Sequence, residues 1–175
     1  MKRFIERVLS HRMLPYICAG IGLLLVLPSA WIGWQQDDLT QRFLLHGYAD
    51  TTGHGAANLE IFTFLTGSPA QAQALMDMGV APWWTLPTLR LAFWRPLAAL
   101  THYLDYLLWP ESPLLMHVQS LAWFIALVIT AALLYRRYLG TSMTAGLAAL
   151  FFALDDVHGL AAGWIANRNT LLTLL

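Results

Sequence analysis

The sequence predicts an all-α membrane protein, with several transmembrane helices and a long outer loop that contains interfacial helices. Three observations predict this fold class. The chain of 175 residues is 58% apolar and only 11% charged, whereas a soluble domain carries about 25% charged residues. Two apolar stretches are long enough to span a bilayer, and basic residues cluster beside them. The net charge is zero, so no nucleic-acid partner is expected.

The first apolar stretch, residues 14–34, contains no charged side chain. At about 1.5 Å per residue, it is long enough to cross a hydrocarbon layer about 30 Å thick. A cleaved signal peptide is the alternative, but its apolar core would be shorter, and Pro28 disfavours cleavage before Trp31. We therefore predict a transmembrane anchor. Cys18, the only cysteine, lies inside it, so neither a disulfide nor a cysteine metal site is expected.

The basic residues predict the orientation of the spans. Residues 1–13 carry mostly basic charges, and the second span, residues 113–135, is followed by Arg136 and Arg137. Basic residues flank transmembrane helices on the cytoplasmic side. Residues 1–13 and the turn at 136–137 are therefore predicted to be cytoplasmic, and residues 35–112 form the outer loop.

A third, shorter span is predicted at residues 138–154, and it leads back to the outer side. Residues 155–168 follow as a second outer motif. Residues 169–175 resume an apolar pattern and begin a fourth span that is left incomplete, so we expect a fragment of a longer protein. The expected location is the inner (plasma) membrane, or the endoplasmic reticulum membrane in a eukaryote, with the chain crossing it several times.

Two helices are expected in the first part of the outer loop. Asp38, followed by Gln41, is predicted to cap a helix over residues 39–48. The Gly-rich residues 47–58 are then predicted to form a loop. A second helix begins after Ser68, an N-cap residue before a proline, and ends before a glycine.

A third helix in the outer loop, opening at Pro96, is amphipathic. Leucines form one side, while the other side carries Thr101, His102 and Asp105. This pattern is typical of a helix that lies in the membrane interface, with Trp94 and Trp109 at the level of the headgroups.

Two adjacent carboxylates, Asp37 and Asp38, directly follow the first span. In one interpretation they are a solvated helix end and an N-cap. In the other they are a general base or a metal ligand held just outside the membrane, where a lipid-linked substrate presents its head group. Paired carboxylates raise one another's pKa, which suits proton abstraction or the binding of a divalent cation.

A second polar group, Asp155, Asp156 and His158, ends the third span. Because that span is short, its acids are expected near the interface, since a charge at mid-depth is costly. Asp155 and His158 are three residues apart and share a helical face. The group is either a simple outer flank or a functional motif, and its three side chains alone are too few for a zinc site.

Two arginines are candidates for phosphate binding, because a guanidinium offers a planar fork of donors that matches phosphate oxygens. Arg95, beside Trp94, can instead extend from an interfacial helix towards water. Arg168 interrupts the start of the predicted fourth span, and a salt bridge to Asp155 or Asp156 is its alternative role.

The remaining polar and aromatic residues are expected to be structural or interfacial. Trp83 and Trp84 can stack on a sugar, but the aromatic belt of the membrane interface is favoured. Four histidines have no partner at a convincing spacing: His46, His54, His102 and His117.

An outward anchor followed by an acidic pair, a long outer loop and a second acidic motif resembles the opening of the GT-C class of membrane glycosyltransferases. The segments FWRPLAALTHYLDYLLW, MHVQSLAW and GLAALFFALDDVHGLAAGWIANRNTLL follow the order and spacing of one branch, the TPR-containing transmembrane O-mannosyltransferases. The likeness covers most of the chain. The sequence departs from the branch at Asp155 and Asp156, where the branch has His-Pro, and at Gln119, where it has Asn.

The resemblance implies transfer of a sugar from a polyprenyl-phosphate donor to a hydroxyl of a protein or glycan acceptor, with inversion at the anomeric carbon. It implies that Asp38, with Asp37 beside it, is the catalytic carboxylate. Arg168 and Arg95 would hold the donor phosphate. A fragment of this length is not expected to be active alone, because further spans complete the fold of GT-C proteins.

The acidic second motif is similar to that of GT-C members that hold a divalent cation between two outer loops. Asp155, Asp156 and His158 would then either position Asp38 and the acceptor or, through the two acids and Asp38, bind Mg²⁺ or Mn²⁺. A non-catalytic membrane protein, such as a transporter or scaffold subunit, is the alternative. Transporters keep ionisable groups near the bilayer midplane, whereas this chain is predicted to hold them at the outer ends of its spans.

Overall fold

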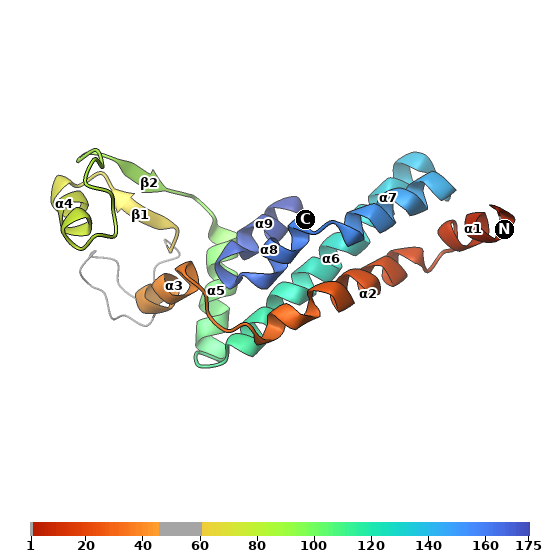
Figure 1. Ribbon diagram of the computed structural model, residues 1–175, viewed down its shortest axis with the longest axis horizontal. Helices are drawn as coiled ribbons and strands as arrows, with labels where there is room; N and C mark the ends of the chain where they lie inside the picture. The colour runs from red at the N-terminus through yellow and green to blue at the C-terminus, as the bar shows by residue number, and fades with distance from the viewer. Residues whose placement is uncertain (1, 46–60) are drawn as a thin grey trace. The chain divides into compact units, whose positions relative to one another are not determined.

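The computed structural model describes residues 2–45 and 61–175, with the side chains of residue 2 and residues 43–45 left out (Figure 1). The described chain is mostly helical and forms two compact units. The first unit contains residues 1–38 and 109–175, and the second contains residues 39–108. The predicted loop at 47–58, His46 and His54 lie outside the described residues.

The first unit is a bundle of helices built from both ends of the chain (Figure 1). Its helices are α1 (Lys2–Leu9), α2 (Leu14–Val26), η1 (Leu27–Trp31), α6 (Pro113–Leu139), α7 (Met143–Leu154), α8 (Val157–Gly163), η3 (Ile165–Asn167) and α9 (Arg168–Leu174). A further helix, α3 (Asp37–Leu45), begins in this unit and continues into the second.

Two helical segments are long and apolar enough to cross a membrane, at the places where the sequence predicts the first two spans. They are residues Leu14–Trp31, formed by α2 and η1, and α6. Pro28 is the second residue of the 3₁₀ helix η1, which follows α2. Since proline has no N–H, it cannot continue the hydrogen bonds of the α-helix. The second span is longer than predicted. α6 continues through Arg136 and Arg137 and ends at Leu139, and the next residue, Gly140, has a φ of 68° that suits glycine.

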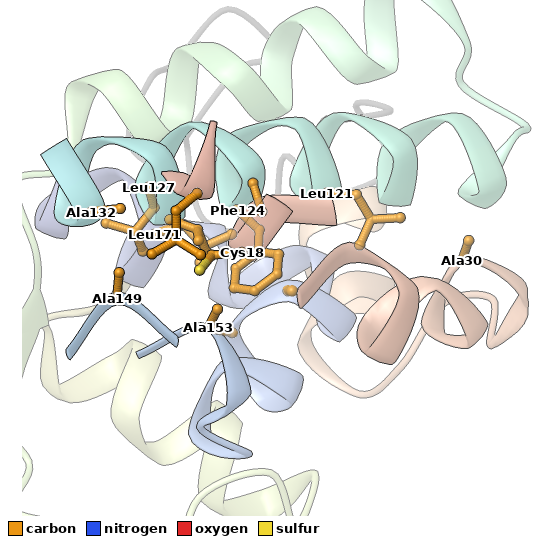
Figure 2. Packing of buried hydrophobic residues seen from close by; sticks show 14 of the residues in the cluster. Cys18, Ala30, Leu121, Phe124, Leu127, Ala132, Ala149, Ala153 and Leu171 are labelled. Carbon is orange, nitrogen blue, oxygen red and sulfur yellow. The ribbon is translucent and has the colours of Figure 1, made fainter. Parts of the chain in front are cut away.

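The core of the first unit lies where α2, α6 and α7 pack together (Figure 2). Phe124 of α6 fills the space that Gly22 of α2 leaves open, since a Cβ at Gly22 would come within 3.1 Å of the phenyl ring and 3.2 Å of the Ala153 carbonyl oxygen. Small residues such as Ala149 and Ala153 line the rest of the contact. Small side chains allow helix backbones to approach closely, which stabilises helix pairs in a bilayer.

The third predicted span, residues 138–154, differs in the structure. α7 has only 12 residues, because Ser142 caps its start by accepting a hydrogen bond from the Ala145 N–H at 3.2 Å. At about 1.5 Å per residue, such a helix is roughly 18 Å long, too short for a bilayer core of about 30 Å. α7 and α8 meet at a bend of 55° and, taken together, are long enough for one bent span.

The second unit contains a small sheet, so the prediction of a purely α-helical chain is wrong in this region. Strands β1 (Thr63–Thr66) and β2 (Arg90–Ala92) pair antiparallel, with a bulge between Thr63 and Leu65. The strands are short, and TFLT alternates too briefly to be told from a loop by sequence pattern. Their connection contains α4 (Pro69–Asp77), as predicted, with Ser68 as the N-cap.

The amphipathic helix of the outer loop is present as α5 (Pro96–Leu108). Its polar residues Thr101, His102 and Asp105 are at most 3% exposed, while its leucines form the exposed side. The exposed leucines are Leu97, Leu100, Leu104, Leu107 and Leu108. This arrangement is the one expected of a helix whose outer face meets lipid.

Candidate functional site

Asp38 is fully buried, and hydrogen bonds from two distant parts of the chain hold its carboxylate. Oδ2 accepts a hydrogen bond from the Gln35 N–H at 2.9 Å, and Oδ1 accepts one from the Ala166 N–H at 2.6 Å. Asp38 is therefore not the N-cap that the sequence predicts, since α3 already begins at Asp37. The fold places the first acidic motif directly against the segment Ile165–Arg168.

Burial raises the pKa of the Asp38 carboxyl above its ordinary value, because the charged form loses its hydration. The hydrogen bonds from Gln35 and Ala166, and then electrostatic interactions with His117 and Arg168, oppose this rise in pKa. A carboxylate with a raised pKa is a better proton acceptor than an exposed aspartate, so its environment suits general base catalysis.

Arg168, at the start of α9, is also fully buried. Its guanidinium donates to the Ser120 Oγ at 3.0 Å, to the Met116 carbonyl oxygen at 2.8 Å and to the Gln119 Oε1. All three acceptors lie in the first turns of α6. The salt bridge to Asp155 or Asp156 that the sequence suggested is thus replaced by contacts with α6.

His117 connects the same part of α6 to the end of the first span. Its Nε2 lies 2.9 Å from the Gly33 carbonyl oxygen. The sequence pattern offered no partner for His117 and did not assign Gln119 or Ser120 to the site. The available signal was the presence of three polar residues, His117, Gln119 and Ser120, inside an apolar span. Polar groups in a transmembrane helix face the bundle and find partners there.

The second acidic motif lies in the bend between α7 and α8, and not beside Asp38. Asp155 and Asp156 are exposed, and Asp155 Oδ1 accepts a hydrogen bond from the Val157 N–H at 3.1 Å. His158 is 7% exposed, and its ring centroid lies 4.6 Å from that of Phe152 and 5.5 Å from that of Phe124. Arg168 contacts Met116 and His158 contacts Phe124. These two positions on α6 are eight residues apart, which is about two helical turns or roughly 12 Å.

The other two predicted site residues are Asp37 and Arg95. Asp37 is exposed in the first turn of α3. Arg95 belongs to the second unit, where its guanidinium carbon lies 4.6 Å from the ring centroid of Phe93 and 5.1 Å from that of Phe62. Both are cation–π contacts, in which the positive charge lies over an aromatic ring.

A shared cation site of Asp38, Asp155 and Asp156 gains no support from these positions. Over residues 2–45 and 61–175, no three histidine, cysteine or acidic side chains gather in a way that suits a metal ion. The divalent cation stays a prediction from the sequence.

No family model, curated protein or solved structure matches the chain. The likeness to GT-C glycosyltransferases therefore rests on the motifs described above.

Proposed function

We propose that the chain belongs to an integral membrane glycosyltransferase that moves a sugar from a polyprenyl-phosphate donor to an acceptor hydroxyl at the outer membrane face. One observation carries the proposal. The hydrogen bond from the Ala166 N–H to Asp38 Oδ1, at 2.6 Å, joins two motifs that the sequence separates by 128 positions. Asp38, the predicted general base, and Arg168, the predicted phosphate-binding residue, thus belong to one buried cluster.

In the proposed reaction, Asp38 accepts the proton of the acceptor hydroxyl. The hydroxyl oxygen attacks the anomeric carbon of the sugar and forms the new glycosidic bond, while the bond from that carbon to the phosphate oxygen breaks. Polyprenyl phosphate leaves with the bonding electrons, and the configuration inverts. A carboxylate oxygen accepts more than one hydrogen bond, so Asp38 can receive this proton while it holds the N–H groups of Gln35 and Ala166.

Arg168 contributes positive charge beside the carboxylate. Its contacts with Met116, Gln119 and Ser120 fix the guanidinium, so the charge needs no reorganisation when the phosphate departs. Its role in this proposal is electrostatic stabilisation of the leaving phosphate.

A second candidate function is a non-catalytic membrane protein, such as a transporter or scaffold subunit. Arg168 favours it, because its three named contacts are all with α6 and would equally serve to hold helices together. The separation of Asp155 and Asp156 from Asp38 favours it too.

Sugar transfer by the complete protein in liposomes, with labelled polyprenyl-phosphate sugars as donors, tests the proposal. Asp38→Asn should lower the rate roughly 10²–10⁴-fold, the usual contribution of a general base. Asp77→Asn, a change at an exposed aspartate of α4, should leave the rate unchanged. Asp156→Asn with and without a chelator tests the predicted cation.

Equal transfer by the Asp38→Asn variant and the unchanged protein would contradict the catalytic role. An absence of transfer with every polyprenyl-phosphate sugar, at normal expression, would favour the non-catalytic alternative.

A further inference from the structure

Helix α1 has a charged side and an apolar side, and the rest of the unit covers only part of the apolar side. Successive residues of a helix are about 100° apart, which places Phe4, Ile5, Val8 and Leu9 together. Leu9 is 8% exposed, whereas Phe4, Ile5 and Val8 are 71%, 44% and 43% exposed. The surface of α1 therefore presents three apolar side chains that are each more than two-fifths exposed.

The opposite side of α1 is basic. Arg3 and Arg7 are both exposed there, and Glu6 is the only acid of the helix. Arg12, in the turn after α1, and Arg137, near the end of α6, are exposed as well. An occupant of this surface must offer hydrocarbon to one side of the helix and negative charge to the other.

Two contacts fix the direction in which α1 leaves the bundle. The Leu9 carbonyl oxygen lies so close to Gly146 of α7 that a Cβ there would be 2.2 Å away. The guanidinium of Arg136 donates to the carbonyl oxygens of His11 and Arg12, the latter at 3.0 Å. The exposed apolar side of α1 is therefore held in one orientation immediately before the first span.

We propose that α1 lies in the plane of the membrane and binds anionic phospholipids, in the leaflet opposite to the one that faces Asp38. The span Leu14–Trp31 separates α1 from Asp38, and the bilayer surface is the nearest partner to a helix that ends five residues before this span. Phe4, Ile5 and Val8 enter the hydrocarbon boundary, while Arg3 and Arg7 meet phosphate groups. Each basic side chain near an anionic surface strengthens binding roughly fivefold.

Site-specific fluorescence on the complete protein tests this placement. Cys18 is replaced with Ala, and single cysteines at Phe4, Val8 and Glu6 are labelled with an environment-sensitive dye. The labelled proteins are reconstituted in phosphatidylcholine vesicles, with or without phosphatidylglycerol, that contain brominated acyl chains. The dye at positions 4 and 8 should be quenched in the anionic vesicles, while the dye at position 6, on the charged side, should stay in water.

Charge reversal supplies the second arm. Arg3→Glu combined with Arg7→Glu should abolish the quenching at position 4 while the thermal unfolding midpoint is kept. Equal quenching at positions 4 and 6 would show that α1 is an ordinary basic flank and would overturn the proposal. Quenching that is the same without phosphatidylglycerol would overturn the specificity for anionic lipid. Protection of position 4 from both lipid bromines and aqueous iodide would identify a protein as the occupant, and this result also contradicts the proposal.

Discussion

Arg168 joins α9 to α6 through three hydrogen bonds from one side chain. Its guanidinium is fully buried and serves Met116, Gln119 and Ser120 together, so no smaller or singly directed donor replaces it. Because one side chain satisfies acceptors on three residues, the cost of its loss is not that of a single hydrogen bond.

Arg168→Met is expected to destabilise the protein, since each buried acceptor that loses its partner costs roughly 1–3 kcal/mol. Thermal unfolding in detergent measures the change. Arg137→Met, a change at an exposed arginine of α6, is the matched control and should shift stability by no more than about 0.5 kcal/mol. Equal midpoints for the two variants would show that the contacts of Arg168 carry no net stability.

The raised pKa of Asp38 predicts a pH dependence of stability. Above the ordinary pKa of aspartate, the unfolded chain has lost this proton while the buried carboxyl still holds it. The folded state then binds more protons than the unfolded state, so the free energy of unfolding falls as pH rises up to the raised pKa.

Asp38→Asn should remove this slope, and denaturant unfolding at a series of pH values measures it. Asp37→Asn, a change at the exposed neighbour, should keep the slope. Sugar transfer should respond in the opposite direction and increase over the same pH window, because only the ionised carboxylate accepts a proton. A slope that persists in Asp38→Asn would assign the titration to another group.

The residues of the site were only partly predictable from the sequence. Asp38 and Arg168 stand out because charge is rare in so apolar a chain, and a rare charge next to a span needs an explanation. The partners of these two residues could not be predicted from the sequence. Ala166 contributes only a backbone N–H, and the contact of His117 with Gly33 spans 84 positions. No local pattern encodes such pairs, which exist only once the helices have packed.

At the scale of helices, the position of glycine sets how closely two of them approach. Gly146 of α7 admits the Leu9 carbonyl oxygen. Gly20 of α2 is exposed, and apart from its chain neighbours and the backbone of its own helix, a methyl group added there would meet no described atom within 4 Å. The two glycines differ in surroundings while both lie inside helices.

Gly146→Ala is expected to destabilise the protein by roughly 1–3 kcal/mol, the usual cost of overpacking, and to displace α1 from α7. Gly20→Ala should be neutral or slightly stabilising, because alanine favours helix. Thermal unfolding of both variants in the same detergent makes the comparison. A smaller loss for Gly146→Ala than for Gly20→Ala would contradict the close approach of Leu9.

Helix boundaries follow from local chemistry that the sequence shows, but one was still misplaced. The Ser68 cap and the start of α6 were predicted correctly. The start of the third helix was misplaced. Residues 138–154 are apolar almost throughout, so hydropathy alone does not reveal that α6 ends before Gly140 and that α7 begins after the Ser142 cap. The sheet was missed since pairing between β1 and β2 joins residues more than twenty positions apart.

For the whole molecule, the bend between α7 and α8 decides where the second acidic motif lies. If the two helices form one bent span, Asp155 and Asp156 stand roughly 18 Å along it from the start of α7, inside the bilayer rather than at its outer end. The contact of His158 with Phe124, in the middle part of α6, agrees with this depth.

Cysteine labelling in sealed vesicles tests this arrangement, in the background of Cys18→Ala. A cysteine at Asp37 should react quickly with a membrane-impermeant maleimide applied from the outer side. A cysteine at Asp156 should react more slowly, although both side chains are exposed in the isolated chain. Equal and rapid labelling would place residues 155–156 at the outer surface and would contradict a single bent span formed by α7 and α8.

The contacts of Arg168 also bear on how the protein is made. Arg168 is the first residue of α9, and its guanidinium is buried against α6. α6, which carries Met116, Gln119 and Ser120, leaves the ribosome before α9 does, so acceptors for this guanidinium are already in place when α9 arrives. We therefore expect the order of helices along the chain to let Arg168 pair with α6 as soon as α9 has been synthesised.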